Sequence, residues 1–233
     1  METQPEPLTD NNIHKAVRLW YSDKDTAMRQ YGDISQWNTH EVMNMKELFR
    51  DMKDFNDDIS GWDVSQVIDM GGMFRGARAF NQPIGKWKVS LVIDMGSMFF
   101  NAVAFNQPIG QWNVSQVANM GWMFSGAYAT AFNQDIGQWN VSQVTNMGYM
   151  FSGARAFNQP IGQWNVANVT NMRDMFNHAV AFNQPLAQWN VANVTNMRSM
   201  FDGARAFNQP LEQWNVGNVT TMQQMFSGAS AFN

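Results

Sequence analysis

Apolar residues recur along most of the chain with a period of 25. In one copy, Ile109, Trp112 and Val114 are separated by polar residues. The tryptophans mark the period at Trp37, Trp62, Trp87, Trp112, Trp139, Trp164, Trp189 and Trp214. Each step is 25 residues except that from Trp112 to Trp139, where Thr130 and Ala131 are additional. A fixed period of this length indicates stacked coils, because one coil cannot bury its own apolar face.

Each repeat has two halves that predict different elements. In the first half, Trp112 and Val114 alternate with polar residues, which predicts a short half-buried parallel strand. In the second half, Val117, Met120 and Met123 fall at helical spacing, which predicts a short helix. We therefore expect an α/β solenoid: a right-handed, leucine-rich-repeat-like coil with one short parallel strand and one short helix per repeat.

The beginning of the chain lacks the repeat. Residues 1–33 are expected to form a flexible N-terminus, a capping helix and a connector, before eight coils over residues 34–233. The helix is predicted from Leu8 to Trp20, with Thr9 as its N-cap. A single apolar stripe would cover the first coil, formed by Ile13, Ala16, Val17 and Trp20. Residues 21–33 are expected to be the connector.

Four residues of one copy represent the expected interior. Trp112, Met120 and Phe124 belong to columns predicted to pack inside the stack, with the indole N–H of the tryptophan needing a partner. Asn133 follows a phenylalanine at a fixed bend, where its amide can satisfy backbone groups of the turning chain. These positions predict structural use rather than a ligand site.

Two phrases of the repeat resemble a known family. The segment MFDGARAFNQPLEQWNV at residues 200–216 and the phrase NVTNM at residues 193–197 are similar to the BspA-like leucine-rich-repeat surface proteins. The resemblance extends over residues 31–233. It implies a leucine-rich-repeat-like coil, an extracellular or cell-surface location, and a role in adhesion or recognition. It implies no catalytic residue.

Composition narrows the possible functions. The net charge is −4 and no basic stripe is present, so nucleic acid is not an expected partner. No cysteine is present, which excludes disulfides and thiolate chemistry. His14, His40 and His178 lie far apart, so no metal site is predicted. No apolar run is long enough to span a membrane, and the N-terminus has no signal-peptide pattern. No cofactor and no enzymatic activity are expected.

One candidate surface lies on the predicted strands. Polar amides there would repeat at the ~4.8 Å strand spacing and could bond to one another in ladders. Two interpretations are open: the amides protect the sheet, or they form a polar grid for a polysaccharide or a partner strand. The ladder would comprise Gln111, Asn113, Gln138, Asn140, Gln163, Asn165, Gln188 and Asn190.

A second candidate surface is aromatic. Large side chains occupy mostly polar columns of the predicted helices, close to the two-residue insertion. Such exposed patches often mark contact sites, although these residues could equally pack together at the insertion. The patch comprises Phe100, Trp122, Tyr128 and Tyr149, with Arg173 and Arg198 at its edge.

The leading expectation is a non-enzymatic interaction module, an adhesin-like scaffold whose partner is a protein or a polysaccharide. The alternative is a structural spacer or a self-assembling rod. The final coil is expected to expose Trp214, Met222 and Phe226, which would allow end-to-end self-association. We also expect the array to continue beyond Asn233, because the sequence stops within a repeat.

Overall fold

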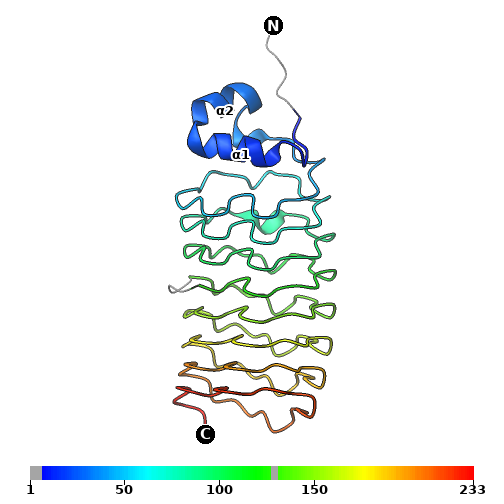
Figure 1. Ribbon diagram of the computed structural model, residues 1–233, viewed down its shortest axis with the longest axis vertical. Coiled ribbons are helices and arrows are strands. Elements are labelled where there is room, and N and C mark those ends of the chain that lie inside the picture. The colour runs from blue at the N-terminus through cyan, green and yellow to red at the C-terminus, as the bar shows by residue number, and fades with distance from the viewer. Residues whose placement is uncertain (1–6, 127–130) are drawn as a thin grey trace.

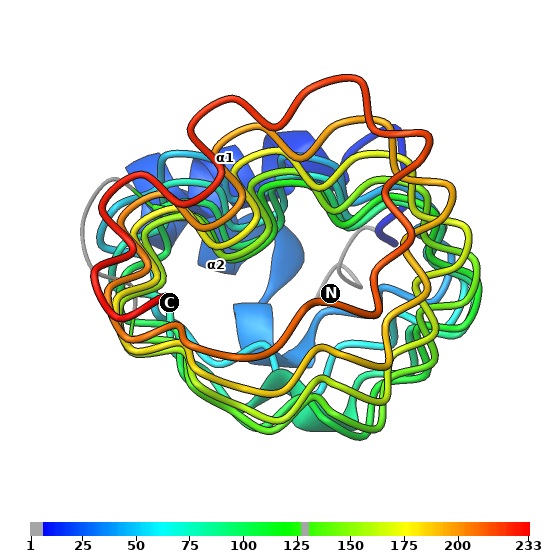
Figure 2. The same ribbon diagram turned by 90° about the horizontal axis from the view of Figure 1, so that it is seen from below.

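The 25-residue units stack on one another as successive coils of an elongated molecule (Figure 1). The computed structural model describes residues 7–126 and 131–233. Two helices cover the N-terminal end of the stack, and the C-terminus lies at the opposite end (Figure 1). Seen along the stack, the coils nearly superpose, so equivalent residues form columns (Figure 2).

The N-terminal cap consists of two helices rather than one. Helix α1 spans Ile13–Ser22 and α2 spans Lys24–Tyr31. The predicted start at Leu8 with Thr9 as N-cap is wrong, because the Thr9 carbonyl accepts from the N–H groups of the following turn and α1 begins after Asn12. The predicted connector is largely α2, whose N-cap Asp23 accepts the Thr26 N–H at 3.0 Å. The predicted apolar stripe of α1 is buried.

The expected α/β solenoid with a strand and a helix in each repeat is wrong. Beyond α2, the described residues contain two three-residue 3-10 helices, η1 at Ile34–Gln36 and η2 at Ile84–Lys86, and no β-strand. Neighbouring coils are joined instead by isolated parallel bridges, one for each pair of coils. These run from Asn44↔Asp69 through Asp94↔Asn119 to Asn196↔Thr221.

The first half of each repeat turns too tightly for a strand. The Trp112 N–H donates to the Ile109 carbonyl of its own coil at 3.1 Å, and the Val117 N–H donates to the Val114 carbonyl at 2.9 Å. The link to the preceding coil is a side chain, since Trp112 Nε1 donates to the Ile84 carbonyl at 3.2 Å. The alternation of apolar and polar residues is present, but the backbone groups are not paired in a ladder.

The second half of the repeat does not form a helix, because alternate backbone N–H groups donate to carbonyls of the next coil. Met95 and Ser97 donate to the carbonyls of Asn119 and Gly121 in the next coil, at 3.0 and 2.8 Å. The Met98 N–H, which lies between the outward-donating groups of Ser97 and Phe99, donates to Met95 in its own coil at 3.1 Å. An α-helix would direct every N–H to the fourth preceding residue. One column also has positive φ, which an α-helix excludes: Gly72, Ser97, Trp122, Tyr149, Asp174, Ser199 and Gln224.

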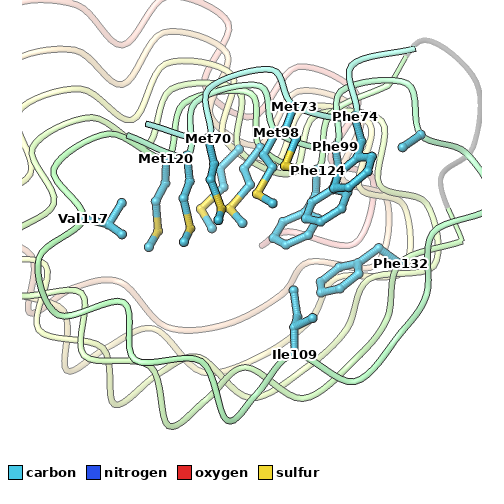
Figure 3. Close-up of a cluster of buried hydrophobic side chains, with 14 of the residues drawn as sticks. Met70, Met73, Phe74, Met98, Phe99, Ile109, Val117, Met120, Phe124 and Phe132 are labelled. Carbon is cyan, nitrogen blue, oxygen red and sulfur yellow. The ribbon is translucent and has the colours of Figure 1, made fainter. Parts of the chain in front are cut away.

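The interior is a set of continuous side-chain columns. Trp112, Met120 and Phe124 are all buried. Phe124 lies between Phe99 and Phe151, with each ring centroid 5.7 Å away and the ring planes nearly parallel. Figure 3 shows the methionine and phenylalanine columns side by side in successive coils. Each coil therefore buries its apolar residues against its two neighbours.

An asparagine column closes each bend. The Asn133 side-chain oxygen accepts the Asn158 N–H of the next coil at 2.9 Å and Gln159 Nε2 at 3.0 Å. The same pattern holds at Asn106 and Asn158, so a side chain performs the pairing that a strand would provide. No helix within residues 7–126 and 131–233 is long and apolar enough to cross a membrane.

Candidate binding surface

Three aromatic residues from consecutive coils meet on the surface that carries the positive-φ column. The Trp122 and Tyr149 rings are stacked, with centroids 3.7 Å apart and planes inclined by 9°. Phe100 contacts Trp122 edge-on at 5.6 Å. Trp122 is 39% exposed, whereas Phe100 and Tyr149 are half-buried. We call Phe100, Trp122 and Tyr149 the aromatic ridge; Tyr128, also expected in this patch, lies outside the described residues.

Two members of the ridge adopt a backbone conformation that suits glycine. Trp122 has φ 64° and Tyr149 has φ 60°, and the equivalent residue in an earlier coil is Gly72. The left-handed region costs an L-residue roughly 1–2 kcal/mol. An aromatic pair contributes only ~0.5–1.5 kcal/mol beyond the area it buries. The fold therefore gains little from having aromatic side chains at these positions.

Arginines lie at both ends of the ridge. The Arg75 guanidinium lies over the Phe100 ring at 5.3 Å, and Arg173 lies over Tyr149 at 5.4 Å. Arg173 is also paired with the buried carboxylate of Asp174 at 3.0 Å. Burial, followed by the hydrogen bond and negative charge of Asp174, raises the pKa of Tyr149. The Tyr149 hydroxyl is thus a neutral hydrogen-bonding group at neutral pH.

Arg198 is half-buried one coil beyond Arg173. Its positive charge acts on Tyr149 in the opposite direction to Asp174, as does that of Arg173. The two arginines expected at the edge of the patch therefore both lie within electrostatic reach of the ridge.

A hollow opens beside Trp122. It has a volume of about 230 Å³ and is lined by Arg75, Ser97, Phe100 and Trp122. A furrow of about 200 Å³ adjoins it and shares Arg75, Ser97 and Trp122. The remaining lining residues of the furrow are Lys46, Glu47, Gly71, Gly72, Asp94, Gly96, Asn119, Gly121 and Asn146.

The furrow is bordered by a ladder of side-chain amides. Asn119 Nδ2 donates to Asp94 Oδ1 at 3.0 Å, and Asn146 Nδ2 donates to Asn119 Oδ1 at 3.0 Å. Asn171 Nδ2 continues the ladder to Asn146 at 2.9 Å. These residues belong to the Asn-Met phrase of the repeat, and the sequence did not mark them as a candidate site. The available signal was the glycine two positions after the asparagine, at Gly121 and Gly148.

Glycines in the preceding coil leave the space that these amides occupy. A Cβ atom on Gly96 would lie 2.4 Å from Asn119 Nδ2, and one on Gly121 would lie 2.7 Å from Asn146 Nδ2. The later coils have Arg173 and Arg198 in this column, and no described hydrogen bond joins the Asn196 amide to Asn171. The ladder therefore ends at Asn171, one coil beyond Asn146, which is the last asparagine that lines the furrow.

The asparagines of the ladder predicted from the sequence form hydrogen bonds within their own coils, and not from coil to coil. Asn113 Oδ1 accepts the Ser115 N–H of its own coil at 3.2 Å, and Asn140, Asn165 and Asn190 repeat that bond. No hydrogen bond among the described residues joins one of these amides to another. The glutamines are exposed at Gln111, Gln138, Gln163 and Gln188.

In the part of the chain that the structure describes, acidic and histidine side chains do not gather into a metal site. Within residues 7–126 and 131–233, no group of three His, Asp or Glu residues could hold a metal ion. His40 contacts Asp63 at 2.9 Å, whereas His178 contacts Asn177 at 2.8 Å, far along the stack.

Comparison with known proteins gives one match. The family model described as Mycoplasma protein of unknown function, DUF285, matches residues 19–131 and again residues 122–233. The two matches together run from α1 to the final residue. No curated protein and no solved structure matches the chain.

Proposed function

The chain belongs to the DUF285 family of Mycoplasma proteins of unknown function, and we propose that it is a non-enzymatic interaction module. Its partner is a protein or a polysaccharide, and its binding surface is the aromatic ridge with the hollow beside it. The resemblance of the NVTNM phrase to the BspA-like surface proteins supports an adhesin-like role outside the cell.

The observation that carries this proposal is the stack of the exposed Trp122 on the half-buried Tyr149, both at left-handed backbone positions. Glycine would fit the backbone better there, and Gly72 occupies the same column. Since the backbone cost and the stacking gain nearly cancel, packing alone gives little reason for tryptophan and tyrosine. Contact with a partner would explain the tryptophan and the tyrosine at these positions, because aromatic residues flanked by arginine are typical of the energetically dominant part of an interface.

The test is capture of partners by the intact chain and by the double variant Trp122→Gly/Tyr149→Gly. The control is Ser199→Gly/Gln224→Gly, which makes the same backbone change in the same column away from the ridge. We expect the ridge variant to keep its circular dichroism spectrum and to unfold within about 1 kcal/mol of the parent chain.

Capture from a panel of glycans and surface proteins should be lost in the ridge variant and kept in the control. Equal capture by the parent chain and both variants would show that the ridge is not the binding surface.

A further inference from the structure

Resting on this proposed function, we propose a ligand class for the hollow. The site formed by Arg75, Ser97, Phe100 and Trp122 binds a carboxylate-bearing sugar unit of an acidic polysaccharide. The ring of the sugar lies against Trp122, the carboxylate binds Arg75, and the chain continues along the adjoining furrow.

The shape of the hollow suits one saturated ring. Tyr149 covers one face of Trp122 at 3.7 Å. Ser97 and Arg75 come from the two preceding coils, so the hollow lies on the opposite side of the indole. Its volume of about 230 Å³ exceeds the ~150 Å³ cavity that accepts a benzene ring. A pyranose presents a flat face of C–H groups that packs on an indole, while its hydroxyl groups point outward.

Arg75 supplies the preference for an acid. Its guanidinium lies over Phe100, and none of the ion pairs among the described residues involves it. Stacking uses the face of the guanidinium and leaves its N–H edges available. Those edges match a carboxylate in bidentate geometry, which strengthens the bond and fixes its direction.

Groups along the furrow suit the hydroxyls of neighbouring sugar units. The Asn119 side-chain oxygen accepts hydrogen bonds from Gly121 N and Asn146 Nδ2. One of its two side-chain N–H groups donates to Asp94. Its second N–H is left to donate. The described bonds to Asp94 use Oδ1, so Oδ2 can accept, as can the Ser97 hydroxyl. Asp94, Asn119 and Asn146 present such polar groups from successive coils along the furrow.

An extended peptide fits this furrow less well. A peptide that adds as a strand needs unpaired backbone groups at the edge it joins. Here the Gly72 N–H donates to the Gly96 carbonyl at 2.8 Å, and the Ser97 N–H donates to the Gly121 carbonyl at 2.8 Å. The free hydrogen-bonding groups belong to side chains, which suits hydroxyl-rich ligands.

The experiment measures binding of the full chain to three acidic probes by titration calorimetry: oligogalacturonate, hyaluronan oligomers and sialyllactose. Their neutral counterparts are methyl-esterified oligogalacturonate, chitooligosaccharides and lactose. The variants are Arg75→Gln and Trp122→Gly, with the exposed Arg205→Gln as the matched control.

We expect at least one acidic probe to bind more tightly than its neutral counterpart. Arg75→Gln should weaken that binding by roughly 10- to 100-fold, to the level of the neutral probe. Trp122→Gly should abolish binding of both, and Arg205→Gln should change neither.

Equal affinity for acidic and neutral probes, or no effect of Arg75→Gln, would overturn the inference. So would the absence of all glycan binding while the ridge-dependent capture of a protein persists, an outcome that leaves the proposed function standing. If the capture of no partner, protein or glycan, depends on the ridge, both this inference and the proposed function are overturned.

Discussion

At the scale of single residues, glycine and asparagine act as a pair. The glycines that line the furrow leave room for the amide of the next coil. At Gly96 the missing Cβ is the space that Asn119 Nδ2 occupies, since the two atoms would be 2.4 Å apart. The asparagine in turn accepts the N–H of the glycine in its own coil, as Asn119 does from Gly121 at 3.1 Å.

This arrangement predicts the effect of adding one methyl group. Gly96→Ala should destabilise the chain by about 1–3 kcal/mol, because the Asn119 amide must move or lose its bond to Asp94. Gly217→Ala is the control, since its nearest contact would be Asn215 Oδ1 at 3.3 Å and other coils have Ala167 and Ala192 in that column. Urea unfolding of both variants measures the difference; equal stabilities would contradict the role assigned to Gly96.

Asp63 gives a prediction about pH. Its carboxylate accepts hydrogen bonds from Ser65 and His40, which lower its pKa to about 2. An unfolded aspartate has a pKa near ~3.9, so the stabilisation is complete above that value and is lost as the pH falls through about 2. The Asp63→Asn variant keeps an acceptor for the Ser65 N–H, as Asn113 does for Ser115 at 3.2 Å.

The free energy of unfolding of Asp63→Asn should therefore lie below that of the parent chain at pH 7. The difference should shrink towards zero as the pH approaches about 2. A difference that stays constant over this range would show that the charge of Asp63 is not responsible.

At the scale of elements, the sequence predicts which residues are inside better than it predicts the backbone. The burial of Trp112, Met120 and Phe124 follows from apolar periodicity alone. The helix expected at Met120 and Met123 does not form, because helical spacing is also produced by tight turns whose alternate N–H groups bond to the next coil. Periodicity reports the direction of side chains, and not the partner of each backbone group.

The candidate site was predictable to a similar extent. Trp122 and Tyr149 stand out in the sequence because they interrupt a polar column, and they do meet in the structure. The hollow could not be foreseen, since it depends on Arg75 and Ser97 from two other coils. The Asn119 ladder was hidden for a different reason: its residues look like ordinary members of the repeat.

The helical cap gives a prediction at this scale. Trp20 is 3% exposed on α1, donates from Nε1 to Asp57 at 3.0 Å, and contacts Trp37 edge-on. Trp20→Ala should cost about 3–5 kcal/mol, because it removes the main cover of the first coil. Tyr21→Ala, at a position 44% exposed on the same helix, should change stability by less than about 0.5 kcal/mol. Thermal unfolding compares the two, and similar costs would argue that the cap does not seal the stack.

At the scale of the whole molecule, each coil depends on its neighbours. Phe124 is stacked between two rings of adjacent coils. Within the described residues, the half-buried Phe226 stacks on a single ring of an adjacent coil, Phe201 at 5.6 Å, besides Phe232 of its own coil at 4.1 Å. Phe124→Ala should cost about 3–5 kcal/mol and Phe226→Ala roughly half of that or less. Equal costs in denaturant titrations would mean that stability is shared globally rather than between neighbours.

The last described coil presents a row of donors. The N–H groups of Met222, Gln224 and Phe226 occupy the positions that bond to a following coil elsewhere, and no acceptor among the described residues meets them. The Met222 and Gln224 carbonyls already accept within the coil. An acceptor for these three N–H groups would have to come from outside the described residues.

The recurring left-handed position has an evolutionary consequence. Its side chain leaves the tryptophan, methionine and phenylalanine columns untouched, so selection can replace it without rebuilding the scaffold. Duplication of one unit would add another such position in register with the rest. Binding specificity in such an array can therefore change by single substitutions at this column while the scaffold stays the same.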